Sequence, residues 1–215
     1  PPAACRPPAT GGVAGAAIPD SVMVRRDIEV LASDRFEGRR TGTAGNDSAA
    51  AYLATQYAAL RLQPAPDGGS GCGAGCAAAY LRRFTATEPV RNGPPTVMPT
   101  QNLVGLIPGT DPTVANEYVM IGAHFDHLGR STSGALDPDR GAEIRNGADD
   151  NARGTAAVLA LARRLAQRPT RRPILVAHFS GEEEGLLGSA YMAEHPPVPI
   201  RQMVAMLNFD MEIGR

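Results

Sequence analysis

The stretch YVMIGAHFDH, residues 118–127, joins a run of apolar residues to two imidazoles and a carboxylate. Two further runs of this kind, short and rich in Val, Ile, Leu or Met, span residues 174–179 and 203–208. Continuous apolar runs are typical of strands that are buried on both faces. Residues 152–167, between the first two runs, carry an apolar stripe at helical spacing. This strand, helix, strand order predicts an α/β fold with a central sheet and helices on both faces.

Weaker signals extend this pattern towards the N-terminus. Apolar residues at helical spacing predict helices at 22–32 and 47–60. The apolar run 103–107 ends at a Pro-Gly pair, which predicts another strand that closes in a turn. Stretches rich in Pro and Gly predict loops at 63–76 and 89–99.

Composition limits the classes of protein to consider. With 215 residues, 43% of them apolar, the chain can bury one sizeable core, so we expect a single domain. A formal net charge of -1 and 5% aromatic residues without Trp provide neither a basic surface nor many stacking platforms, so nucleic acid is not expected as a partner. No stretch approaches the roughly 18 to 20 apolar residues that cross a bilayer. We therefore expect no membrane span.

The N-terminal residues and the three cysteines give hints about processing. Residues 1–18 are mostly Pro, Ala and Gly, which predicts a disordered leader or linker ahead of a domain at 19–215. A lipid-modified Cys5 is the weaker alternative there, because Pro2 stands where such sites usually carry Leu. Cys72 and Cys76 lie in a Gly-rich segment that lets their sulfurs meet, which favours a local disulfide. A disulfide fits a secreted or periplasmic protein.

Side chains that bind metal follow the predicted strands. The residues that lie at or just after strand ends are His124, Asp126, Glu182, Glu183 and Asp210. Ligands of open α/β sheets gather where the carboxyl ends of strands meet, so we expect these side chains to converge. Imidazole with several carboxylates suits zinc, or manganese and cobalt in its place, rather than a cluster built on thiolates. The pattern predicts a metal-dependent hydrolase.

Four ordered motifs resemble the aminopeptidase Y and aminopeptidase S family of co-catalytic zinc exopeptidases, which includes bacterial leucyl aminopeptidases. They are GAHFDHLG at 122–129, NGADDNARG at 146–154, FSGEEEGLLGS at 179–189 and LNFDM at 207–211. Residues 36–45 also resemble the Glu-Gly-Arg turn of that family, so the resemblance runs from about residue 20 to the end. It implies a mixed central sheet in a zinc exopeptidase architecture. The short path from 84 to 101 leaves no room for the protease-associated insert of some relatives.

The resemblance implies a role for each candidate residue. His124 and Asp210 would hold one zinc, Glu183 would hold the other, and Asp150 would bridge the two, with Asp149 as the alternative bridge. Glu182 would be the general base that takes a proton from the water activated by the two zinc ions and passes it to the departing amine. The spacing on a strand end places Asp126 where its carboxylate can orient the His124 ring.

The end of the chain is the main departure from the family. There, the second zinc takes its remaining ligand from a histidine downstream of the Asn-x-Asp motif, whereas this sequence ends at Arg215. We therefore expect an incomplete domain that alone binds at most one metal tightly and has little peptidase activity. Of the other histidines, His127 is expected to shape its loop, with a supporting role behind the metal ligands as the lesser option. His178 is expected in the core and His195 at a helix end.

Three functions are compatible with these residues. An aminopeptidase acting on peptides is the leading interpretation. A carboxypeptidase or dipeptidase of the same superfamily, or a single-zinc glutaminyl cyclase, is the runner-up. A receptor-like domain without catalysis is the third, and the retained His124, Asp150, Glu182, Glu183 and Asp210 argue against it.

Overall fold

The structure is a computed structural model that describes residues 20–67, 75–88 and 93–211. The expected leader at 1–18, including Cys5, lies outside the described residues, and so does Cys72. Cys76 is disulfide-bonded, which agrees with the expectation that this cysteine is oxidised.

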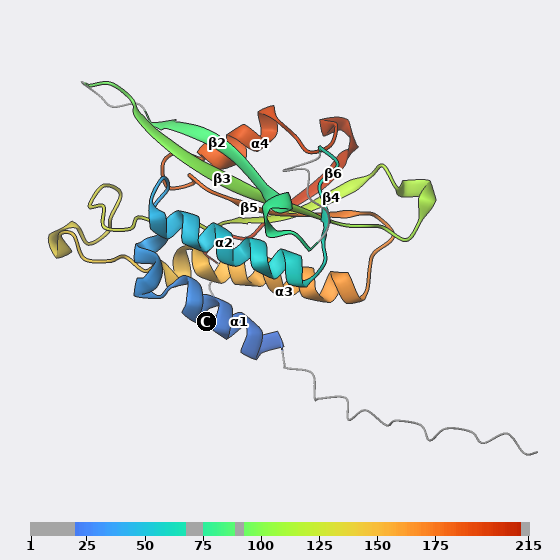
Figure 1. The fold of residues 1–215 in the computed structure, drawn as a ribbon, viewed down its shortest axis with the longest axis horizontal. Coiled ribbons are helices and arrows are strands. Elements are labelled where there is room, and N and C mark those ends of the chain that lie inside the picture. Colours follow the sequence, from blue (N-terminus) through green and yellow to red (C-terminus); the bar gives the residue numbers. More distant parts are fainter. Residues whose placement is uncertain (1–19, 68–74, 89–92, 212–215) are drawn as a thin grey trace, which may run out of the picture.

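One mixed sheet forms the centre of the molecule (Figure 1). The strand order is β1-β3-β5-β4-β6, and β2 also pairs with β3. β4 is parallel to both β5 and β6, whereas β3 is antiparallel to its neighbours β1, β2 and β5. The strands are β1 Gln63–Pro64, β2 Leu81–Glu88, β3 Thr96–Ile107, β4 Tyr118–His124, β5 Ile174–Phe179 and β6 Met203–Asn208.

Helices cover both faces of this sheet, as the sequence predicts (Figure 1). On one face, Leu53 and Val158 from two of the helices pack with Ile121 and Val176 of the sheet in one core cluster. On the opposite face, Met192 packs in a second cluster of buried residues. The first face is covered by α1 Asp20–Leu31, α2 Ala44–Ala59 and α3 Gly154–Gln167, and the second by α4 Leu187–Glu194.

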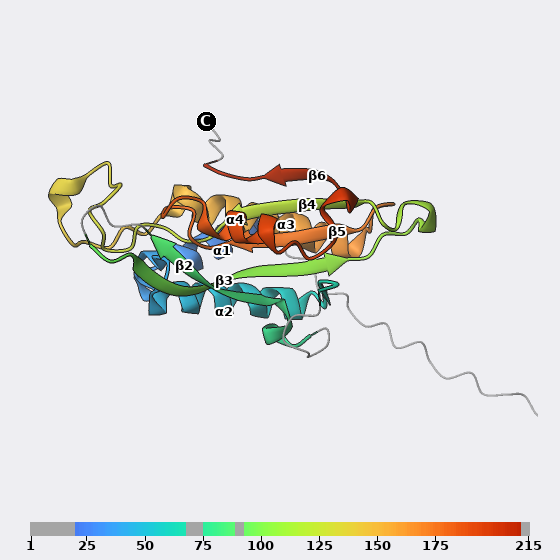
Figure 2. The ribbon, with the colours of Figure 1, turned by 90° about the horizontal axis from the view of Figure 1, so that it is seen from above.

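Two local predictions are wrong. The loop expected at 89–99 is a strand from Thr96 onwards, because β3 pairs with β2 as far as the Thr96–Glu88 pair. Pro99 fits within β3 because β5 pairs only with residues 103–107, so no described strand needs the missing N–H of Pro99 on that side. The run 203–208 is a strand, as predicted, but it is not buried: β6 is the edge strand next to β4, as Figure 2 shows, and most of its residues are exposed.

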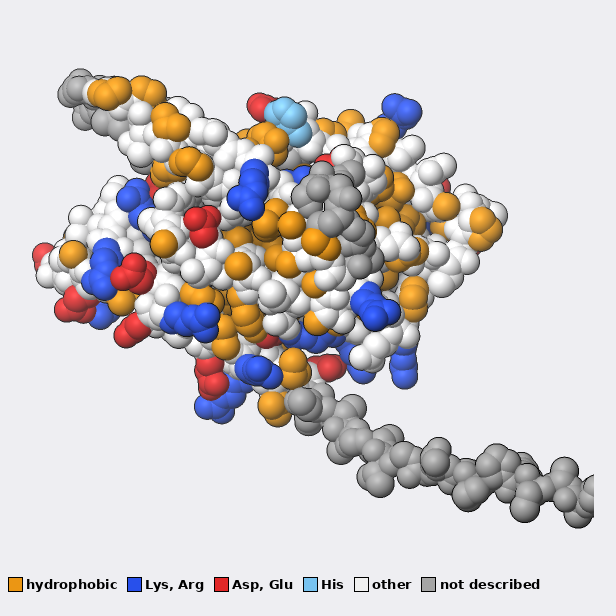
Figure 3. Space-filling model, in the orientation of Figure 1, with side chains coloured by type: hydrophobic (Ala, Val, Ile, Leu, Met, Phe, Trp, Pro, Cys, Tyr) orange, Lys and Arg blue, Asp and Glu red, His pale blue; other side chains and the backbone are white. Residues whose placement is uncertain are grey.

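Within the described ranges, no helix has the length and apolar character needed to cross a bilayer. On the face drawn in Figure 3, Arg and acidic side chains are interspersed with apolar ones. The charge on that face is therefore mixed.

Candidate metal centre

The parallel strands deliver the candidate side chains to one edge of the sheet. In the β4 and β5 ladder, His124 pairs with Phe179, and in the β4 and β6 ladder, Gly122 pairs with Asn208. β4 and β5 therefore end at the same level, and β6 ends two residues earlier, so Asp210 follows the end of β6 by the two residues that separate Gly122 from His124. The predicted convergence of the candidate residues at the carboxyl ends of these strands is what the structure shows.

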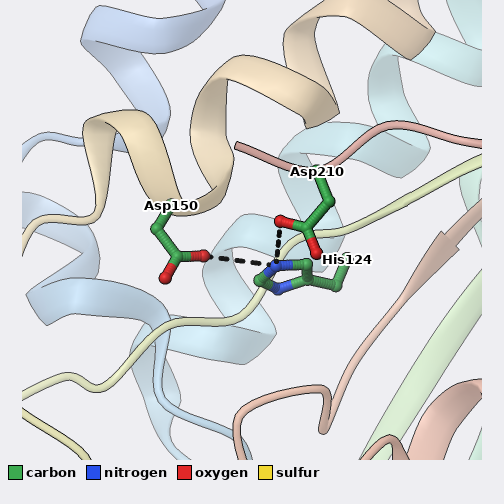
Figure 4. A group of neighbouring side chains, drawn as sticks. All are labelled: His124, Asp150 and Asp210. Carbon is green, nitrogen blue, oxygen red and sulfur yellow. Dashed lines mark ion pairs between the residues drawn. The ribbon is translucent and has the colours of Figure 1, made fainter. Parts of the chain in front are cut away.

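His124, Asp150 and Asp210 form a first trio (Figure 4). The His124 Nε2 atom lies 3.3 Å from Asp150 Oδ1 and 3.4 Å from Asp210 Oδ1. A tetrahedral zinc with bonds of about 2.0–2.1 Å places its donor atoms about 3.3 Å apart. The spacing and the chemistry of these three donors therefore fit a zinc ion.

His127, Asp150 and Glu183 form a second trio beside the first. His127 Nδ1 lies 2.6 Å from Glu183 Oε1 and 3.8 Å from Asp150 Oδ2. The two carboxylate oxygens of Asp150 thus face different trios, as a bridging residue requires. The alternative bridge, Asp149, instead pairs with Arg153 at 2.8 Å. His127 was expected to shape its loop or, as the lesser option, to support the ligands, and the second imidazole of the His-x-Asp-His pattern was the available signal for its place beside Glu183.

Asp126 lies behind the His124 ring, but its hydrogen bonds go elsewhere. Its Oδ1 is 3.5 Å from His124 Nδ1, and that nitrogen is the single buried side-chain N or O atom without a hydrogen-bond partner in the part of the chain that the structure describes. Asp126 accepts hydrogen bonds from the Thr41 hydroxyl at 3.0 Å and from the backbone N–H groups of Glu182 and Glu183 at 3.3 Å each. Its main geometric effect is therefore to hold the Glu-Glu turn against the end of β4.

A buried arginine that the sequence analysis did not single out joins the loops of the site. Arg39 has no exposed surface and donates to the backbone carbonyls of Phe125 at 2.8 Å, Asn146 at 2.7 Å and Gly147 at 2.9 Å. It also donates to the carbonyl of Leu31. Burial lowers the pKa of Arg39 to about 10, although nearby carboxylates oppose that shift. Arg39 thus holds the loop after β4 and the loop before Asp150 in one arrangement. Arg39 is the last residue of the Glu-Gly-Arg turn at residues 37–39.

A second set of buried polar groups supports the turn after β5. Ser180 Oγ accepts from Asn46 Nδ2 at 3.0 Å and from Thr100 Oγ1 at 2.8 Å. The Ser180 backbone N–H donates to Asn102 Oδ1 at 3.0 Å. All four residues are buried. Because each buried polar group has a partner, the network fixes the backbone from which Glu182 and Glu183 project.

The segment that carries Asp210 is held through Asn151. The Asn151 side chain donates to the Phe209 carbonyl at 2.9 Å and accepts from the Gly154 backbone N–H at 3.0 Å. A Cβ atom at Gly154 would lie 2.3 Å from Asn151 Oδ1 and 2.5 Å from the Phe209 oxygen. Glycine is therefore required there, which gives a physical reason for the Asn-Ala-Arg-Gly sequence.

Charge is unevenly distributed in the cluster. Burial lowers the pKa of His124, but Asp126 and Asp150 beside the ring outweigh it and bring the pKa to about 11. The hydrogen bond with His124 lowers the pKa of Asp150 in return. Burial raises the pKa of Glu182, the His124 ring opposes that rise, and the neighbouring Glu183 carboxylate adds to it. The carboxylates at this site therefore stabilise a positive charge among them.

Two cavities open beside the trios. One of about 190 Å³ is lined by His124, Glu182 and Asp210 on its polar side and by Phe179 and Met206 among its apolar residues. Another, of about 370 Å³, is lined by the members of the second trio and by the loop of residues 128–147. Both trios are therefore accessible to a ligand.

The remaining histidines lie where the sequence predicts. His178 is buried in β5, with Nδ1 2.7 Å from the Tyr57 hydroxyl and Nε2 3.2 Å from the Thr155 carbonyl. His195 follows the last residue of α4. Neither belongs to a trio of potential metal ligands found among the described residues.

Comparisons with known proteins bear on the family and the fold. The model of the family described as Peptidase family M28 matches residues 102–214. A probable zinc metalloprotease of Leptosphaeria maculans is 34% identical over 124 residues, which cover 58% of this chain and 27% of that protein. The fold is similar to a Zn-dependent exopeptidase of Parabacteroides distasonis, with a TM-score of 0.65, 20% identity, and coverage of 91% of this chain and 61% of that one. It is also similar to the glutaminyl cyclase of Porphyromonas gingivalis, with a TM-score of 0.64, 21% identity, and coverage of 89% and 59%.

At these identities, the likeness to the two solved structures shows the fold alone. It confirms the predicted mixed α/β architecture of the zinc exopeptidases. The chain spans 27% of the fungal relative and 61% and 59% of the two solved chains.

Proposed function

Because the chain belongs to peptidase family M28, whose model covers just over half of it, we propose that it is a zinc-dependent exopeptidase that removes N-terminal residues from peptides. The observation that carries this proposal is the first trio, in which His124 Nε2 lies 3.3 and 3.4 Å from the Asp150 and Asp210 carboxylates. Those distances suit a zinc ion, and the cavity beside them has room for a substrate side chain. The aminopeptidase Y and S subfamily remains the specific form of this proposal.

The metal ligands are assigned from the two trios. His124 and Asp210 would hold one zinc ion and Glu183 a second, and Asp150, whose two carboxylate oxygens face the two trios, would contribute to both. Bound zinc ions supply Lewis acidity, bringing the pKa of water towards roughly 7 and polarising the scissile carbonyl. Manganese or cobalt can take the same nitrogen and oxygen donors.

Glu182 is the general base. Its side chain lines the cavity beside the first trio, and its Oε2 lies 4.0 Å from His124 Nε2. Glu182 takes one proton from the attacking water and delivers it to the nitrogen of the departing amine, so its own charge is restored after each turnover.

Asp126 acts through other groups. By accepting the backbone N–H groups of Glu182 and Glu183, it orients the base and one ligand with the same carboxylate. Its position behind the His124 ring also favours the tautomer with the proton on Nδ1, which leaves the Nε2 lone pair for the metal.

The cavity beside Glu182 accommodates the side chain of the residue that is removed. Phe179, Leu186 and Met206 are its apolar lining residues. An apolar residue of the substrate buries its surface there, whereas a charged one would lose its hydration. Leucine p-nitroanilide is therefore the first substrate to assay.

The test compares Glu182→Gln with the unaltered residue, both in the full-length protein, because little hydrolysis is expected of residues 1–215 alone. Hydrolysis of leucine p-nitroanilide should fall by at least about 100-fold, because general acid–base catalysis contributes about 10²–10⁴-fold, while the zinc content stays the same. Glu29→Gln, in the exposed pair of α1 with Arg25, is the matched control and should leave turnover unchanged. Unaltered turnover in Glu182→Gln would remove Glu182 from this role.

The same assay separates the alternatives. N-acetyl-leucine p-nitroanilide should not be cleaved, since an aminopeptidase needs a free amine. A carboxypeptidase would instead release the C-terminal residue of a blocked peptide. Cyclisation of a peptide with an N-terminal glutamine releases one ammonia, which is detected as a mass loss of about 17 Da. That result would favour the single-zinc cyclase.

A secreted or periplasmic location is part of the proposal. The disulfide at Cys76 supports it, because disulfides persist mainly in oxidising compartments. Fractionation of the source cells, with thiol labelling of Cys76 before and after reduction, tests it directly.

A further inference from the structure

The loop after β4, residues 128–147, forms one wall of the cavity of about 370 Å³ beside the second trio. It projects past the carboxyl end of β4 and is yellow in Figures 1 and 2. The apolar side chains that line this cavity are Leu128, Leu136, Ile144 and Met211. Leu136 is fully exposed, more than any other large apolar residue in the part of the chain that the structure describes. Its whole apolar surface is therefore available to a ligand of the cavity.

A buried arginine holds this loop in shape. Arg145 donates to the backbone carbonyls of Asp137 at 2.9 Å and Gly141 at 3.0 Å, and its Nε donates to Asp137 Oδ1 at 3.0 Å. The Arg145 backbone N–H donates to the Gly129 carbonyl at 2.8 Å, which joins the two ends of the loop. Because Leu136 directly precedes Asp137, the same contacts fix its backbone. The loop thus presents Leu136 in a defined place beside the cavity.

The charged side chains of the lining are paired with one another. Arg140 lies 2.7 Å from Glu143 and 3.3 Å from Asp137, which also pairs with the buried arginine of the loop. His127 Nδ1 and Glu183 Oε1 are 2.6 Å apart and share a hydrogen bond. A charged ligand would lose its hydration without gaining a partner among these groups, whereas an apolar one would bury its surface against the apolar lining. The cavity therefore favours an apolar or aromatic side chain.

We propose that this cavity binds the apolar side chain of the second residue of the peptide, and that Leu136 determines this preference. The inference rests on the proposed aminopeptidase and names its substrate class. The two carboxylate oxygens of Asp150 face the two trios, so a peptide bond placed at the metals has one cavity on each side. The cavity beside Glu182 is assigned to the residue that is removed, so the cavity beside Glu183 receives the residue that follows. Its volume lies within the range of about 300–1,000 Å³ that is typical of ligand pockets.

The experiment uses the full-length protein and two tripeptide amides, Leu-Phe-Ala and Leu-Gly-Ala, which differ only in the second residue. Release of leucine gives kcat/KM for each, and the value for the phenylalanine peptide should be at least about 10-fold higher, because apolar pockets discriminate by that much or more. Leu136→Ser should lower this ratio to less than about 3-fold, whereas Leu136→Met, which keeps the apolar surface, should retain it. Val97→Ser is the matched control and should also retain the ratio, since Val97 is 60% exposed on β3 and lines neither cavity.

Binding is measured separately in the full-length Glu182→Gln protein, in which little turnover is expected. Calorimetry should give a dissociation constant at least about 10-fold lower for the phenylalanine peptide than for the glycine peptide. Leu136→Ser in the same background should remove most of that difference.

The two measurements separate this inference from the proposed function. Equal affinities and rates for the two peptides, a ratio that Leu136→Ser leaves intact, or one that Val97→Ser also removes would each overturn the inference. Release of leucine would still support the aminopeptidase in those cases. Selective binding that depends on Leu136, in a protein that releases no leucine from either peptide, would refute the proposed function alone.

Discussion

β5 and β6 flank β4 in the parallel part of the sheet, and each is followed by proposed metal ligands, yet their surroundings differ. All six residues of β5 are buried, whereas β6 is exposed from Val204 to Asn208. The Val204 and Leu207 residues keep 50% and 52% of their surface exposed. The two halves of the proposed site therefore rest on strands with very different packing.

The difference shows how each ligand is held. The turn after β5 is fixed by buried side chains. The Asp126 carboxylate accepts a hydrogen bond from the Glu182 backbone N–H, and the Asn102 side chain accepts one from the Ser180 backbone N–H. The segment after β6 is held mainly through main-chain groups, since the Phe209 N–H donates to the Gly122 carbonyl at 2.9 Å and the Phe209 carbonyl accepts from Asn151. We expect substitutions on the β5 side to change stability and metal affinity together, and those on β6 to change stability little.

Arg39→Met is expected to have the largest effect. Methionine keeps the apolar part of the side chain but removes the guanidinium. The backbone carbonyls that then lose their hydrogen-bond donor are those of Leu31, Phe125, Asn146 and Gly147. Unsatisfied buried carbonyls and a lost charged donor should lower the free energy of unfolding by about 4 kcal/mol or more. Urea unfolding monitored by circular dichroism measures it.

The matched control is Arg25→Met, because Arg25 pairs with Glu29 on the exposed side of α1. Its effect should stay within about 0.5 kcal/mol. An Arg39 variant as stable as this control would show that the buried guanidinium does not hold the loops together.

The next effect is the dependence of stability on pH through His178 of β5. Burial lowers the pKa of His178 from 6.5 to about 4. Below pH 6.5 the unfolded chain binds a proton on this ring, while the folded protein does not until about pH 4. The stability contributed by the neutral ring is therefore complete above pH 6.5 and is lost as the pH falls towards 4, by about 3 kcal/mol in all.

His178→Asn isolates that contribution, because asparagine does not titrate. Between pH 7 and pH 4, the unfolding free energy of this variant should fall by about 3 kcal/mol less than that of the unaltered protein. His195→Asn, at an exposed histidine, is the control for the loss of an imidazole. Parallel profiles for the unaltered protein and His178→Asn would mean that the ring takes up its proton over the same pH range in the folded and unfolded protein, so burial does not shift its pKa.

The three parallel strands and the convergence of the candidate ligands were predictable because both arise from local patterns. The continuous apolar runs 118–123, 174–179 and 203–208 mark strands, and parallel strands carry the residues after them to one edge. The prediction that β6 is buried was wrong because the burial of a strand does not arise from a local pattern. An apolar run indicates that a segment forms a strand, but it does not indicate where that strand lies in the sheet. An edge position follows only from the pairing of all the strands.

The supporting residues were harder to predict than the ligands. Arg39 acts on backbone carbonyls up to 108 residues away, and carbonyls leave no mark in the sequence. Asn46 and Thr100 meet Ser180 from separate elements, and their residue types are common in loops. His127 had the right chemistry, but its direction depends on the loop at Gly147, whose left-handed backbone only the fold reveals.

Asp126→Asn tests whether the β5 side of the site depends on this carboxylate. Asparagine keeps the shape of the side chain but has one acceptor oxygen instead of two. The Glu182 and Glu183 N–H groups and the Thr41 hydroxyl can then no longer all donate a hydrogen bond to it. Zinc affinity should fall about 10–100-fold, which competition titration with a chromophoric chelator measures.

Asp149→Asn is the control for that titration. Asp149 is half exposed and pairs with Arg153, so its loss should leave zinc affinity unchanged. A larger loss in Asp149→Asn than in Asp126→Asn would restore Asp149 as a candidate for the bridging ligand and weaken the assignment of Asp150.

The smallest effects should come from a matched pair of substitutions in the two strands, Val176→Ala in β5 and Val204→Ala in β6. Val176 is fully buried, so the loss of two methyl groups and the resulting cavity should lower the free energy of unfolding by about 2 kcal/mol. Val204 is 50% exposed, so the same change should stay below about 0.5 kcal/mol. Urea unfolding of both variants measures the difference. Equal losses would mean that β6 is packed in solution as tightly as β5, and the contrast between the two sides of the site would no longer hold.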